Sequence, residues 1–86
     1  MPFSFKIEKP TDVKTTFQNL KAKVEKGKGK LVGDDASGTI SVSGVDGTYQ
    51  VLDSHIEVTI VRNRIALFSN AVIERVVRNI FKQASV

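Results

Sequence analysis

The sequence predicts an α+β fold of order β-α-β-β-β-α, with a four-stranded, mainly antiparallel sheet and two helices on one face. Three observations support this: segments in which apolar and polar residues alternate, segments with apolar residues at helical spacing, and turn-forming residues between the strands. The chain has 86 residues, 41% of them hydrophobic and 26% charged. This length and composition predict a single domain, residues 1–86, with one core.

The first strand and the first helix follow from a change in apolar spacing. The alternation in Phe3–Glu8 indicates a strand with one buried face, which Pro10 ends. Thr11 is the expected N-cap of a helix from about Asp12 to Lys26, and Gly27 stands where a left-handed C-cap residue is favoured. The apolar stripe of this helix comprises Val13, Phe17, Leu20 and Val24.

Residues 28–38 carry three glycines and two aspartates without sustained periodicity, which favours a loop. Within it, Leu31 and Val32 fit either a short strand or a plug at the end of the sheet. Alternation returns at Thr39 and indicates the second strand, with Ile40 and Val42 on its apolar side.

Two hairpin turns are expected in the middle of the chain. Asp46-Gly47 is typical of a type I′ turn, because both central residues of that turn need positive φ. A two-residue turn there pairs Val42 with Val51, and a four-residue loop starting at Gly44 keeps the same faces.

Asp53-Ser54 predicts the second turn, which pairs Val51 with Ile56 and Tyr49 with Val58. The last strand is then expected to continue to about Arg62.

The second helix has a broader apolar stripe than the first. The apolar segment 65–68 before it is too short to classify and is expected at the rim of the core, with Ser69 or Asn70 as the helix cap. The wide stripe must be buried against the sheet, the other helix or another subunit. It comprises Val72, Ile73, Val76, Val77, Ile80 and Phe81.

Catalytic and metal-binding patterns are not found. The chain has no cysteine, and its one histidine, His55, is expected on the surface beside Glu57. Asp34-Asp35 is typical of a turn, and the serines have no base placed to activate them. The glycines of Gly27–Gly33 resemble a phosphate loop, but they follow a helix C-terminus, where the dipole repels anions. We therefore expect no enzyme and no cofactor.

The charge suggests one class of partner. The net charge is +4, and basic residues cluster around the end of the first helix and after the last strand. They are candidates for sequence-independent binding of nucleic acid or another polyanion. The predicted exposed sheet face lacks the aromatic residues on which single-stranded RNA stacks, so a solvated lysine surface is the favoured interpretation. The candidate residues are Lys21, Lys23, Lys26, Lys28, Lys30, Arg62 and Arg64.

The run Ser37–Tyr49, the segment Ile56–Ile60 and the helix containing Val72-Ile73-Glu74 together resemble the small polyhydroxyalkanoic acid system proteins. The resemblance covers most of the chain through glycines and alternating apolar residues. It implies a non-catalytic role associated with a polymer or granule and supplies no site residues.

These observations favour a small non-catalytic binding or assembly module that acts through apolar surfaces of its sheet and helices, with a homo-oligomer as one expected form. Binding of a polyanion is the alternative. The N-terminal residues lack the apolar run of a signal peptide and no segment is apolar enough to span a membrane, so a cytoplasmic location is expected.

Overall fold

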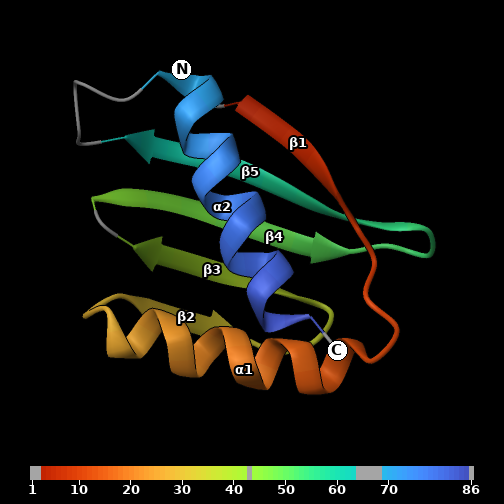
Figure 1. Ribbon diagram of the computed structural model, residues 1–86. Helices are drawn as coiled ribbons and strands as arrows, with labels where there is room; N and C mark the ends of the chain where they lie inside the picture. The colour runs from red at the N-terminus through yellow and green to blue at the C-terminus, as the bar shows by residue number, and fades with distance from the viewer. Residues whose placement is uncertain (1–2, 43, 64–68, 86) are drawn as a thin grey trace.

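A computed structural model describes residues 3–42, 44–63 and 69–85, which form a five-stranded antiparallel sheet with two helices on one face (Figure 1). The α+β prediction is confirmed, with one strand more than expected. The strand order across the sheet is β1-β5-β4-β3-β2. The elements are β1 (Phe3–Glu8), α1 (Val13–Lys26), β2 (Lys30–Gly33), β3 (Ser37–Val42), β4 (Val45–Val51), β5 (His55–Asn63) and α2 (Asn70–Ala84).

The additional strand, β2, lies in the segment for which the sequence favoured a loop. Leu31 is buried and pairs with Ile40 of β3, so the short-strand alternative for this residue is correct. Four residues, the last of them a glycine, are too few to show a period, which is why the pattern did not distinguish the alternatives. At the other edge, β1 pairs with β5, and the sequence had not indicated this partner.

The hairpin between β3 and β4 exists, but the predicted turn at Asp46-Gly47 is wrong. Val42 pairs with Val45, so the chain reverses three residues earlier, where Gly44 adopts a φ of 81°. The earlier turn lengthens both strands and buries Val45 in the core. Gly47 instead lies inside β4, where a Cβ atom would approach the Thr59 carbonyl oxygen on β5.

The second hairpin confirms the sequence prediction. Val51 pairs with Ile56 and Tyr49 pairs with Val58, as a turn at Asp53-Ser54 requires. The Leu52 amide donates to the His55 carbonyl oxygen at 2.8 Å and closes the turn. Nothing in β4–β5 competes with this register, because the alternation is unbroken on both sides of the turn.

Helix α1 begins one residue later than predicted and is capped differently. The Asp12 carboxylate, rather than the Thr11 side chain, accepts a hydrogen bond from the Thr15 amide at 3.0 Å. This hydrogen bond lowers the pKa of Asp12. At the other end, the left-handed residue is Lys28 with φ 65°, whereas Gly27 has φ −86°. The Gly29 amide donates to the Val24 carbonyl oxygen at 2.8 Å, which forms a Schellman motif.

The core lies between the helices and one face of the sheet, and Tyr49 connects its parts. The Tyr49 ring stacks on Phe17 with centroids 4.7 Å apart, and its hydroxyl donates to the Asp34 carbonyl oxygen at 2.6 Å. The ring reaches that oxygen because Gly33 and Gly38 leave room where Cβ atoms would collide with the hydroxyl. Burial, and then the charges of the two neighbouring aspartates, raise the pKa of Tyr49.

Helix α2 buries only part of its apolar stripe. Ser69 caps the helix as expected, and Ile73, Val77 and Phe81 are buried. Val76, which the sequence placed in the core, is 40% exposed. The broad stripe therefore exceeds what the sheet and α1 cover.

Candidate functional site

The face of the sheet opposite the helices is a polar surface. Ser4, Thr59, Thr48 and Thr39 lie side by side across four strands, and the Ser4 and Thr59 hydroxyls hydrogen-bond at 2.8 Å. The aromatic residues Phe5 and Tyr49 are buried on the other side, as predicted. Among the described residues of this face there is no ring on which a base could stack, so the surface does not have the features of single-stranded RNA recognition.

The cationic candidates that lie within the described residues do not gather on one surface. Lys21 lines a hollow beside β2, whereas Lys23 and Lys26 line another hollow beside α2, on the opposite flank of α1. Lys30 and Arg62 belong to the row Lys30–Ser41–Asp46–Arg62 on the uncovered side of the sheet.

Two of the candidates remain to be placed. Lys28 follows the end of α1 and is exposed, and Arg64 lies outside the described residues. Lys30 on β2 and Arg62 on β5 are separated by three strand spacings. Since neighbouring strands are about 4.8 Å apart, the backbones at these two residues are roughly 14 Å apart.

The two helices converge at one end and separate at the other (Figure 1). Near the C-terminus of α2, Phe81 meets Phe17 edge to face with centroids 5.8 Å apart, and the Asn19 amide donates to the Ala84 carbonyl oxygen at 3.2 Å. Toward the C-terminus of α1 the helices diverge, and the end of β3 forms the floor between them.

A hollow of about 350 Å³ occupies this divergence, and we call it the α2 groove. Its floor and walls are apolar and its rim is polar or cationic. The apolar residues are Val24, Val42 and Ile80, and the rim residues are Lys23, Lys26 and Gln83. Val42 and Ile80 are only half-buried, so part of their apolar surface faces the groove. A volume at the lower end of the range for ligand sites is consistent with a shallow contact surface.

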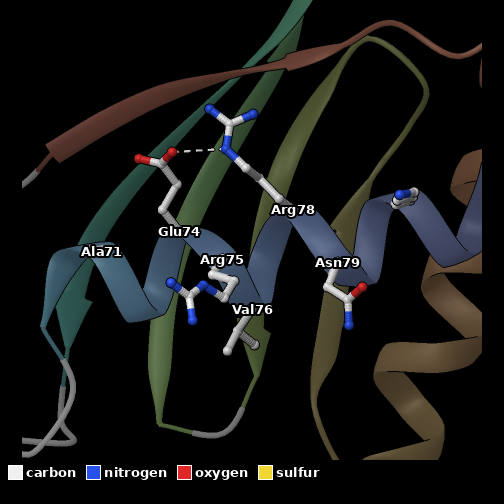
Figure 2. Close-up of a pocket in the computed structure, with 7 residues that line it drawn as sticks. Ala71, Glu74, Arg75, Val76, Arg78 and Asn79 are labelled. Atoms are coloured by element: carbon white, nitrogen blue, oxygen red, sulfur yellow. Dashed lines mark hydrogen bonds and ion pairs between the residues drawn. The ribbon is translucent and has the colours of Figure 1, made fainter.

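Two exposed valines extend the groove along α2. Val72 and Val76 are 38% and 40% exposed, and with Ile80 they follow a spacing of four residues, which places all three on one flank. Figure 2 shows Glu74 and Arg78 directed toward β1, while Val76, Arg75 and Asn79 point to the other side of the helix. We call Val72 and Val76 the valine strip.

The flank of α2 that faces β1 is occupied by polar contacts. The Arg78 guanidinium is 2.8 Å from the Glu74 carboxylate, one helical turn away, and it lies 5.3 Å from the centre of the Phe5 ring. The two flanks of α2 therefore differ. One is satisfied within the chain, and the other presents apolar surface to solvent.

The positive charge of the chain is concentrated on the helices. α1 and α2 carry seven basic and two acidic residues, a net charge of +5, whereas the whole chain has +4. The remaining residues therefore sum to −1. The two helices, which cover one face of the sheet, therefore carry most of the excess positive charge.

One hydroxyl–imidazole contact resembles part of a catalytic arrangement. The Ser54 hydroxyl lies 3.1 Å from Nδ1 of His55, so the expectation that no serine has a base nearby is wrong for Ser54. A Ser–His pair in hydrolases needs a third group that orients the second ring nitrogen. In the described part of the chain, Nε2 of His55 is buried without a hydrogen-bond partner, so this orienting group is missing. His55 is half-buried on the uncovered face, between the turn and Glu57.

The acidic residues are also accounted for by local structure. Asp34 accepts the amides of Ala36 and Ser37 at 2.8 and 3.0 Å, which confirms the predicted turn role and lowers the pKa of Asp34. In residues 3–42, 44–63 and 69–85, no three His, Asp or Glu side chains gather as a metal site would require.

No helix in the described ranges has the length and apolarity needed to cross a bilayer. No family model, curated protein or solved structure matches the chain. The α2 groove and the valine strip are thus the candidate site, and they are identified by geometry alone.

Proposed function

We propose that the chain is a small non-catalytic binding module whose contact surface is the α2 groove together with the valine strip. One observation carries the proposal: the wide apolar stripe of α2 is left partly uncovered beside a hollow with an apolar floor. Helical apolar residues are normally buried against a partner element. A contiguous uncovered patch that is rimmed by polar residues is typical of an interaction surface.

The alternative, binding of a polyanion through the seven cationic candidates, has weaker support. Those of the seven that the structure describes lie on different surfaces, and the row that contains Lys30 and Arg62 also holds Asp46. A dedicated phosphate-binding surface would place cations together without an interposed carboxylate. Cytoplasmic action remains part of the proposal, in keeping with the lack of cysteine.

A neutral apolar dye tests the surface directly. Nile red emission should rise on addition of the protein, and V72S/V76S should lose most of this rise, because the two changes replace the exposed methyl groups of the strip by hydroxyl groups. The variant should remain folded, with an unfolding free energy within about 1 kcal/mol of the unchanged protein, since both positions are exposed.

The chain offers a matched control. Val32 and Val61 are 53% and 54% exposed but lie outside the groove and the strip, so V32S/V61S removes as much exposed apolar surface elsewhere. Dye binding that responds equally to both double variants would contradict the proposed surface. Light scattering over a wide range of protein concentration adds the oligomeric state, and loss of a dimer in V72S/V76S alone would make a second copy the occupant.

A further inference from the structure

The charge around the α2 groove narrows the choice of occupant. The two helices carry a net charge of +5, and the groove itself has Lys23 and Lys26 on its rim. Two copies that met through these helices would bring like charges together, which disfavours association. The complementary partner is acidic.

The position of the valines on α2 indicates a narrow partner rather than a flat one. Arg75, Asn79 and Lys82 are exposed around Val76, and the labelled Arg75, Val76 and Asn79 point away from β1 (Figure 2). A flat lipid surface would have to cover these three polar side chains together with the valines, which is unfavourable. A narrow element that lies along the flank can contact the strip and the groove together.

The length of the apolar surface suits a helix. Val72 and Ile80, with Val76 midway between them, are eight residues apart, or about 12 Å along the helix axis at a rise of about 1.5 Å per residue. An amphipathic helix in a groove contributes apolar side chains every three or four residues, which matches two turns of α2. Acidic residues at the edges of its apolar face would lie near Lys23, Lys26 and Arg75.

We propose, as an extension of the function proposed above, that the α2 groove binds an acidic amphipathic helix of another protein. The apolar face of this helix packs on Val72, Val76 and Ile80, with Val42 at the floor. Its carboxylates lie beside Lys23 and Lys26. These lysines favour it over amphipathic helices whose polar residues are neutral or basic. The interaction is expected to weaken with salt, because the rim charges are exposed.

Two designed peptides of 18 residues test the proposal, where 18 is about five helical turns. They share one leucine stripe, and their outer positions alternate glutamine with glutamate in one peptide and glutamine with lysine in the other. Fluorescence anisotropy of the labelled peptides should show the glutamate peptide binding at least about tenfold more tightly at low salt. V72S/V76S should weaken that binding about tenfold, and V32S/V61S should leave it unchanged.

The lysines are tested separately. K23Q/K26Q should weaken binding of the glutamate peptide by about threefold to tenfold and reduce the dependence of this binding on salt. K6Q/K30Q, on the uncovered side of the sheet, should change neither. Phosphatidylglycerol vesicles and a single-stranded oligonucleotide serve as competing anions. Binding of either that exceeds peptide binding and depends on Lys23 and Lys26 would overturn the proposal.

The outcomes separate this inference from the function on which it rests. If the lysine peptide binds as tightly as the glutamate peptide, or if neither binds while Nile red still distinguishes V72S/V76S from V32S/V61S, the acidic helix is wrong and the apolar binding surface stands. If Nile red does not distinguish the two double variants, both proposals fail.

Discussion

The two helices lie on the same face of the sheet but are held very differently. α1 has a narrow apolar stripe whose central residues Phe17, Leu20 and Val24 are all buried, and its ends are fixed by Asp12 and a Schellman motif. α2 has a wider stripe of which two valines stay exposed. The core therefore covers the apolar stripe of α1 but only part of the wider stripe of α2, and the part left exposed is the contact surface that we propose.

The largest change in unfolding free energy is expected when a buried side chain of the α1 stripe is shortened. Leu20 is fully buried, so Leu20→Ala should lower the unfolding free energy by about 2–5 kcal/mol through lost burial and a cavity. Val76→Ala on α2 should change it by less than about 1 kcal/mol. Urea unfolding of both variants measures the contrast. Equal losses would show that the exposed flank of α2 contributes to the fold as much as α1 does.

The sequence predicted only part of this difference in burial between α1 and α2. The spacing of Leu20 and Val24 was enough to place α1, because its apolar residues recur at helical spacing and form a stripe no wider than the core can bury. For α2 the same rule predicted burial of Val76, which is wrong, since coverage depends on where the two helices diverge. That divergence is set by contacts between distant residues, such as Phe17 with Phe81 and Asn19 with Ala84, which periodicity cannot reveal.

The groove floor was also beyond local reasoning. Val42, which lines the groove with Ile80, is the last residue of β3 and pairs with Val45, whereas the turn chemistry of Asp46-Gly47 favoured a later turn. Here burial of Val45 and two longer strands outweighed a local turn preference. The β4–β5 turn had no such competitor, and its register was predicted correctly.

The next prediction concerns the link between α1 and the sheet. Tyr49 stacks on Phe17 and donates to the Asp34 carbonyl oxygen, so Tyr49→Phe should lower the unfolding free energy by about 1 kcal/mol at neutral pH. The raised pKa of Tyr49 also makes stability depend on pH. Above about pH 10 the unfolded chain loses the phenolic proton while the folded chain retains it, so the unchanged protein loses stability as pH rises.

Tyr49→Phe should abolish this component, and the difference between the two proteins should therefore shrink above pH 10. Tyr49 is the only tyrosine and the chain has no tryptophan, so phenolate absorbance follows its titration directly. A phenol that titrates at its ordinary pH in the folded protein, or a difference that grows with pH, would contradict the contact.

Two neighbouring residues at the C-terminal end of α1 should respond in opposite directions, and the change at the first of them, Lys28, is the smallest that we expect. Lys28 has φ 65°, a conformation that costs a residue with a side chain about 1–2 kcal/mol, so Lys28→Gly should raise the unfolding free energy by about 0.5–1 kcal/mol once the greater entropy of glycine is allowed for. Gly29 is the reverse case, because a Cβ atom there would collide with the Ser41 carbonyl oxygen and approach Val24, and Gly29→Ala should be destabilising. Thermal unfolding of both variants measures the pair, with Lys26→Gln as a control for the lost charge. A gain at position 28 that Lys26→Gln reproduces would be electrostatic. A loss at position 28 would show that α1 is not held by this motif, and the contrast with α2 would then rest on burial alone.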